Sequence, residues 1–187
     1  YLRRQPFLVG GAAALLATAS FAGRGSDGHG SMIYWQAPSI LNPYLSGGTK
    51  DIESSSMIIE PLARYNETGA LVPFLAEEIP TVANGGVSGD LKSITWKLKS
   101  GLKWSDGSAV TSADVKFTGE YCMDPDGGCA QLEKFDGVTS IATPDDRTIV
   151  VSFSAPKPNP YCPFVGFQTP ILHKKQFANC MCAKAPN

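Results

Sequence analysis

The chain of 187 residues is 43% hydrophobic and 18% charged, which is typical of folded globular domains and excludes a disordered chain. At this length it has room for one or two domains. The formal net charge of −1 leaves no basic stripe to neutralise phosphates, so we expect no nucleic-acid partner.

The first residues are typical of a secretory leader. Two arginines precede an uncharged run over residues 7–22, which ends in small residues of the kind that signal peptidase recognises. We therefore predict a signal peptide over residues 1–22 and a flexible tether over residues 23–31. A transmembrane anchor is the alternative. The export route, general secretory or twin-arginine, stays open.

A strand, a loop and a helix are predicted next. The apolar run over residues 32–36 is suited to a buried strand, and Pro38 ends it. A polar, glycine-containing loop then extends to Thr49, which is placed to cap a helix. Apolar residues at helical spacing predict this helix over residues 50–60.

A hairpin and a half-buried strand follow. The turn sequence Asn66–Gly69 lies between short runs at residues 62–65 and 70–72, which predicts a hairpin. Further along, every second residue from Ile94 to Leu98 is apolar and the residues between are polar. This period predicts a strand with one buried face.

The next stretch predicts a tight turn and the start of a helix. In the pair Asp106-Gly107, the carboxylate can hold its own backbone and the glycine can adopt a positive φ. Thr111 and Asp114 have the spacing of a capping box. We therefore predict a helix that begins there and runs toward Tyr121.

Cys122 and Cys129 enclose a tight turn after this helix. In an oxidising compartment we predict a disulfide between them, with free thiols as the alternative. The turn also contains Asp124 and Asp126, but it lacks the remaining ligands of a calcium loop. We therefore predict no metal site there.

The last third of the chain predicts two strands and a return to the core. Alternating apolar residues indicate strands over residues 138–142 and 148–154. Four prolines between residues 156 and 163 forbid ladder pairing and predict an extended connection. The apolar stretch 164–172 is then expected to return to the core.

Three cysteines remain outside the predicted disulfide. His173, Cys180 and Cys182 fit no common zinc spacing and lack a fourth ligand, so we predict no zinc site. Cys162 is a candidate disulfide partner for either Cys180 or Cys182, and loose thiols are the alternative.

Four motifs in order carry a resemblance to a known family. They are Ile40-Leu-Asn-Pro-Tyr-Leu45, Leu71-Val-Pro-Phe-Leu-Ala-Glu77, the stretch from Leu102 to Thr118, and Pro144-Asp-Asp-Arg-Thr-Ile-Val-Val151. The third, L-K-W-S-D-G-x-x-V-T-x-x-D-V-x-F-T, closely resembles the signature of the family 5 extracellular solute-binding proteins. These are the peptide-, dipeptide- and nickel-binding components of ABC importers. One such motif alone is weak, whereas four in the right order are specific.

The resemblance implies a periplasmic-binding-protein-like class II architecture, of α+β or α/β type and present in part. Residues 32–58 would be the first strand and helix of the large ligand-binding lobe, and residues 59–160 the small α+β subdomain. Residues 161–187 would return toward the large lobe. The chain would then be the N-terminal portion of a longer protein, and we expect it to bind solute weakly or not at all by itself.

The resemblance also indicates a ligand site at the loop after the first strand. Ligands of open α/β sheets bind beyond the carboxyl ends of strands, which agrees with this position. Hydroxyl groups and exposed amides in the loop can contact a peptide backbone, and a tyrosine can supply an apolar wall or belong to the core. The candidate ligand-binding residues are Ala37, Tyr44, Ser46, Gly47, Gly48 and Thr49.

The function that the resemblance implies is capture of peptides, or a related small solute, in a cleft between two lobes. The protein would deliver the solute to an ABC permease from the periplasm or the extracellular face of a bacterial membrane. It would need no cofactor and would not be an enzyme. A secreted hydrolase and a structural surface domain are the alternatives. The hydrolase needs a base beside its nucleophile, and His29 and His173 are the only histidines. The solute itself stays open.

Overall fold

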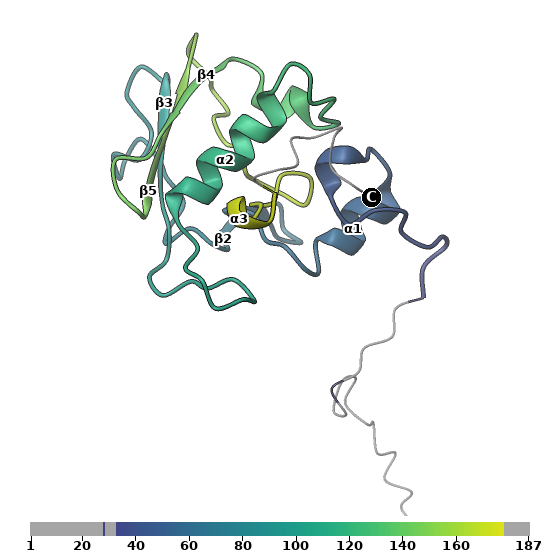
Figure 1. The fold of residues 1–187 in the computed structure, drawn as a ribbon. Coiled ribbons are helices and arrows are strands. Elements are labelled where there is room, and N and C mark those ends of the chain that lie inside the picture. The colour runs from purple at the N-terminus through teal and green to yellow at the C-terminus, as the bar shows by residue number, and fades with distance from the viewer. Residues whose placement is uncertain (1–27, 29–32, 178–187) are drawn as a thin grey trace, which may run out of the picture. The chain divides into compact units, whose positions relative to one another are not determined.

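The larger of the two sheets is three-stranded and antiparallel in the structure, a computed structural model that describes residue 28 and residues 33–177. Its strands are β3 (Ser93–Lys97), β4 (Val138–Ala142) and β5 (Thr148–Phe153), in the order β3-β5-β4 (Figure 1). Trp96 of β3 pairs with Ile149 of β5, and both side chains are fully buried. The three strands predicted from alternation are therefore confirmed.

The helix predicted from the capping box is α2 (Ser112–Met123), which lies across the sheet (Figure 1). The N–H of Thr111 donates to Oδ2 of Asp114 at 2.9 Å, and the capping box is confirmed. The turn before it is also as predicted, because Gly107 has a φ of 83° and Asp106 accepts a backbone N–H. Local sequence chemistry alone thus specifies where this helix begins.

Helix α2 packs tightly against the sheet at Gly119. A Cβ atom at this position would lie 2.2 Å from Cδ1 of Ile141 and 3.1 Å from Cζ of Phe164. The ring of Phe164 in turn packs edge-on against Phe135, with centroids 5.3 Å apart. The predicted return of residues 164–172 to the core is confirmed, because Phe164, Ile171 and Leu172 are all fully buried.

The predicted hairpin is formed by β1 (Ala63–Tyr65) and β2 (Leu71–Pro73), which pair antiparallel as a separate two-stranded sheet. Asn66 closes the turn: its Oδ1 accepts the N–H groups of Thr68 and Ala70 at 3.1 and 2.8 Å. An asparagine that binds its own turn in this way accounts for the local reversal.

The segment after the proline-rich connection lies beside β1. Leu62 N–H donates to the carbonyl oxygen of Phe164, and Gly166 N–H donates to that of Ala63, both at 2.9 Å. One parallel β-bridge joins the two segments. The two segments therefore lie side by side and run in the same direction.

The first helix differs from the prediction at both ends. α1 (Thr49–Ser55) is shorter than the predicted span of residues 50–60, and its N-cap is Gly48, not Thr49. Gly48 takes this place because its carbonyl accepts the first helical N–H groups. The helix ends early where the hydroxyl groups of Ser55 and Ser56 donate to carbonyls three residues back, at 2.8 and 2.7 Å. Serines compete with the helix backbone in this way.

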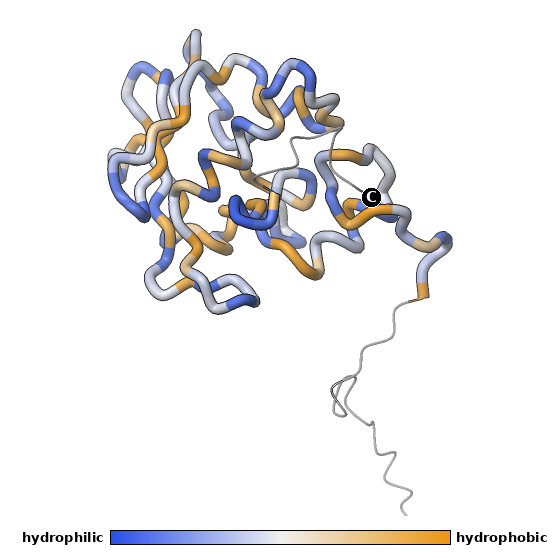
Figure 2. Tube along the Cα trace, in the orientation of Figure 1, coloured by the Kyte–Doolittle hydropathy of each residue, from blue (hydrophilic) through white to orange (hydrophobic). Residues whose placement is uncertain are grey.

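Three short helical turns complete the structure: η1 (Pro43–Leu45), η2 (Leu132–Phe135) and α3 (Lys174–Phe177). Figure 2 shows α3 as a strongly hydrophilic turn, whereas the strands combine hydrophobic and hydrophilic residues. Within the described part of the chain, every helix is too short or too polar to cross a membrane.

The strand predicted over residues 32–36 is wrong for the residues that the structure describes. Residues 33–36 adopt no strand, and Ile33 and Trp35 are 99% and 72% exposed. A strand needs a partner to satisfy its backbone, and the two sheets among residues 33–177 do not extend to this segment. The predicted signal peptide (1–22) lies outside the described residues, and so does the tether (23–31) except for Gly28.

The structure does not test the predicted division of the chain into lobes. The described residues from Tyr34 to Phe177 belong to one compact unit. The boundaries at residues 58 and 160 therefore stay predictions.

Candidate functional site

The loop that was predicted to contact ligand is organised around the buried carboxylate of Asp51. This side chain accepts hydrogen bonds from the N–H of Ser39 at 2.6 Å, from Oγ of Ser46 at 2.7 Å and from Nζ of Lys50 at 2.8 Å. The bond from Lys50 contributes most to a pKa of Asp51 well below its usual range, and those from Ser46 and Ser39 add to it. Asp51 is therefore an anion at neutral pH and ties Ser39 and Ser46 to α1.

The predicted ligand residues differ in how accessible they are. Ala37, Gly47 and Thr49 are exposed, whereas Ser46 and Gly48 are half-buried. The hydroxyl of Ser46 donates to Asp51 and accepts the N–H of Gly48 at 3.0 Å. Ser46 thus shapes the loop, while Gly47 and Thr49 keep surface that a ligand can reach. Their contact with a ligand stays a prediction.

Of the two roles left open for Tyr44, a ligand wall or a core residue, the structure favours the core. Its side chain is fully buried, and its hydroxyl donates to the carbonyl oxygen of Pro170 at 2.7 Å. Its ring packs edge-on against Tyr121 at 6.1 Å. Tyr44 is a core residue because it lies under the loop, where it fills the space between α2 and the segment near Pro170.

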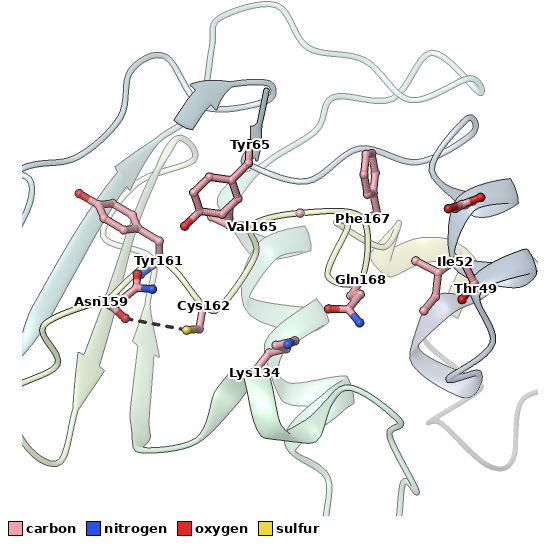
Figure 3. Close-up of a pocket in the computed structure, with 12 residues that line it drawn as sticks. Thr49, Ile52, Tyr65, Lys134, Asn159, Tyr161, Cys162, Val165, Phe167 and Gln168 are labelled. Atoms are coloured by element: carbon pink, nitrogen blue, oxygen red, sulfur yellow. Dashed lines mark hydrogen bonds between the residues drawn. The ribbon is translucent and has the colours of Figure 1, made fainter. Parts of the chain in front are cut away.

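A cavity of about 470 Å³ lies next to the loop and shares Thr49 with it. Figure 3 shows Tyr65 and Tyr161 on one side of it, Thr49 and Ile52 of α1 on the other, and Cys162, Lys134 and Gln168 between them. The remaining lining residues are Glu53, Asn159, Val165, Gly166 and Phe167. Except for Thr49, none of these residues was a sequence candidate.

Two aromatic side chains that line the cavity are held in place by residues outside its lining. The guanidinium of Arg64 lies over the rings of Phe74 and Phe167, at 4.5 and 4.8 Å from their centroids. The hydroxyl of Tyr161 donates to the carbonyl oxygen of Pro80 at 2.7 Å. The cavity therefore combines fixed aromatic walls with amide and charged groups, an arrangement suited to a ligand with both apolar and polar parts.

Ser108, Asp106 and His173 come together at another place, but not as a catalytic triad. Oγ of Ser108 lies 3.2 Å from Nε2 of His173 and donates to Oδ1 of Asp106 at 2.5 Å. Nδ1 of His173 accepts the N–H of Lys175 at 3.2 Å, so Nε2 carries the hydrogen in the neutral ring. A general base needs a lone pair that faces the nucleophile. The nitrogen that faces Ser108 has none in this tautomer.

The disulfide predicted between Cys122 and Cys129 is formed, with Cα atoms 5.1 Å apart. Cys162 has no disulfide partner among the described residues, and it lies at the cavity. Its predicted partners, Cys180 and Cys182, lie outside the described residues, so that pairing stays a prediction. Among the residues that the structure describes, no group of three or more His, Cys, Asp or Glu side chains is placed to hold a metal ion.

Comparison with known protein families decides the affiliation. Residues 70–181, more than half of the chain, match the bacterial extracellular solute-binding proteins, family 5 (middle). The chain belongs to this family. The match includes three of the four motifs found in the sequence, those in residues 71–77, 102–118 and 144–151.

Several proteins are similar to this family 5 chain. A probable peptide ABC transporter periplasmic-binding protein of Sinorhizobium fredii, y4tO, is 38% identical over 76 residues, which are 40% of this chain and 14% of that protein. The binding protein AgaA of A. tumefaciens R10, solved with agropinic acid, is 29% identical with a TM-score of 0.66 and matches 80% of this chain and 29% of its own. The oligopeptide-binding protein AppA of Bacillus subtilis, solved with a nonapeptide, is 23% identical with a TM-score of 0.67 and matches 77% of this chain and 27% of its own.

These likenesses confirm the predicted fold class. The family 5 chain is a mixed α+β structure that shares the class II periplasmic-binding-protein fold over most of its described length. It spans less than a third of the solved structures named above.

Proposed function

We propose that the chain is the solute-binding component of an ABC importer, exported to the periplasm or the extracellular face of the membrane. It captures a peptide or a related small solute and presents it to a membrane permease. Membership of the family 5 solute-binding proteins carries this proposal. The peptide assignment of y4tO and the agropinic acid bound to AgaA support the two solute classes.

We assign solute contact to the cavity beside α1 together with the exposed part of the loop. Gly47 and Thr49 offer backbone and hydroxyl groups, and Phe167 offers an apolar wall that is 46% exposed. Main-chain hydrogen bonds to a peptide give affinity with little demand on its side chains. No catalytic group is required, and the arrangement of His173 beside Ser108 gives no support to a hydrolase.

The test is a titration of the isotope-labelled chain with short peptides and, separately, with agropinic acid, followed by NMR. We expect weak binding that shifts the amide resonances of Gly47, Thr49 and Phe167. Phe167→Ala should weaken binding by about tenfold, since an aromatic wall contributes roughly 1.5 kcal/mol or more.

The matched control is Val82→Ala, which removes a side chain of similar exposure (56%) that is not part of the cavity. It should leave the titration unchanged. The proposal fails if neither solute moves the resonances of the loop and the cavity at saturating concentrations, or if both variants weaken binding equally. Release of amino acids from the peptides would instead favour the hydrolase.

A further inference from the structure

We propose that Gln131 is a positioning residue for the loop Asn42–Thr49, and that the Cys122–Cys129 disulfide is the brace that holds Gln131 under this loop. The inference rests on the proposed function in one respect only, namely that the loop contacts solute. The bracing itself follows from contacts within the described residues.

The side-chain amide of Gln131 spans the underside of the loop. Although it is a polar residue, Gln131 is only 3% exposed. Its Nε2 donates to the carbonyl oxygens of Pro43 and Ser46, both at 3.1 Å. Both hydrogens of the amide are thus used on carbonyl groups of the first residue of η1 and of the residue that follows η1. A hydrophobic side chain of the same size would leave these carbonyls without this donor.

The disulfide keeps Gln131 at this position. Cys122 belongs to the last turn of α2, and Cys129 lies two residues before Gln131. The N–H of Gln131 points to Sγ of Cys129 at 3.4 Å. The N–H of Ala130 donates to the carbonyl oxygen of Tyr44 at 2.8 Å. Two consecutive residues after the disulfide therefore hold three carbonyl groups of the loop.

The loop contacts the other end of the disulfide as well. Nδ2 of Asn42 donates to the hydroxyl of Tyr121, the residue before Cys122, at 3.1 Å. Asp51 of α1 also fixes the loop through Ser46, and it fixes the segment before the loop through Ser39. The loop is therefore clamped between α1 and the disulfide turn. A clamp of this kind lowers the conformational entropy that solute binding would otherwise have to remove.

The test measures amide protection factors of the loop by hydrogen exchange and NMR, so it needs no solute. The amides of Leu45 and Gly48 report on the loop because they donate to Asn42 and Ser46 within it, at 3.1 and 3.0 Å. Gln131→Glu places a carboxylate against two carbonyl oxygens. We expect their protection to fall by about tenfold, which corresponds to about 1.4 kcal/mol. Protection in β3 and β5 should not change.

A second variant, Gln131→Met, together with a change of pH, distinguishes the hydrogen bonds of Gln131 from its packing. In Gln131→Glu, acidification should restore part of the protection, because a protonated carboxyl group can donate to one of the two carbonyls. Gln131→Met fills the same space without a donor, so its loop should stay loose at every pH. Replacement of both disulfide cysteines by alanine should loosen the same amides. Gln176→Glu, a change in exposed α3, is the matched control.

The outcomes are distinguishable from those of the proposed function. If the variants loosen the loop but no peptide shifts its resonances, the brace stands and the solute assignment fails. If Gln131→Glu and Gln131→Met leave the protection of Leu45 and Gly48 unchanged, the brace is refuted. It is also refuted if β3 and β5 lose as much protection as the loop in the two Gln131 variants, since Gln131 would then support the whole fold.

Discussion

The contact between α2 and β4 can be tested by replacing Gly119 with alanine. The added Cβ would lie 2.2 Å from Cδ1 of Ile141, a distance that forces one group to move. Cδ1 is the end of a flexible side chain, so Ile141 must rotate or shift. The second neighbour, Phe164, is 3.1 Å away at its Cζ atom and cannot retreat easily, because its ring packs against Phe135.

Helix propensity and overpacking of the core change the stability of Gly119→Ala in opposite directions. Alanine inside a helix is favoured over glycine by about 1 kcal/mol. Overpacking a core costs about 1–3 kcal/mol. We therefore expect Gly119→Ala to lower the free energy of unfolding by about 1 kcal/mol on balance. Ile141→Val removes the Cδ1 atom with which the new Cβ would clash. By itself, this variant should lower the free energy of unfolding by about 0.5–1.5 kcal/mol.

The double variant distinguishes this account from a general loss of stability. With Cδ1 gone, the new methyl group fills the space that Ile141→Val vacates. The double variant should therefore be more stable than the sum of the single variants predicts, by about 1–2 kcal/mol. Urea unfolding followed by tryptophan fluorescence measures all four proteins. Additivity within about 0.5 kcal/mol would refute the proposed contact. Gly89→Ala, where a Cβ has open space, is the control.

Two further predictions concern the disulfide and the buried carboxylate. Replacing Cys122 and Cys129 by alanine opens a short covalent loop and should lower the free energy of unfolding by about 2–3 kcal/mol in urea titrations; an unchanged midpoint would contradict it. Asp51→Asn should destabilise the chain at neutral pH. Because the pKa of Asp51 is lowered in the folded state, its contribution is present above the unfolded pKa of about 3.9 and is lost as the pH falls further. The stability difference between wild type and Asp51→Asn should therefore shrink in acid, and a constant difference would refute this role.

The elements that were predicted well are those that local chemistry determines. The capping box at Thr111, the turn at Gly107 and the asparagine turn at Asn66 each use groups within a few residues. The strands β3 and β5 follow from alternation because one face of each is buried. The disulfide was predictable because its cysteines enclose a tight turn.

The failures share a different cause, because they depend on partners far away in the sequence. An apolar run such as residues 33–36 becomes a strand only beside another strand. The role of Tyr44 is set by Pro170, to which its hydroxyl donates. The cavity brings Tyr65 together with Phe167, which belong to separate segments. No pattern within a short window could reveal any of these. Only the serine-rich end of α1 offered a local signal that was missed.

The parallel pairing of β1 with the segment after the proline-rich connection has a mechanical consequence. Tension applied to the two ends of the chain would pull Leu62 and Phe164 in opposite directions along their length. The hydrogen bonds between these segments would then be sheared together, whereas bonds pulled crosswise break one after another.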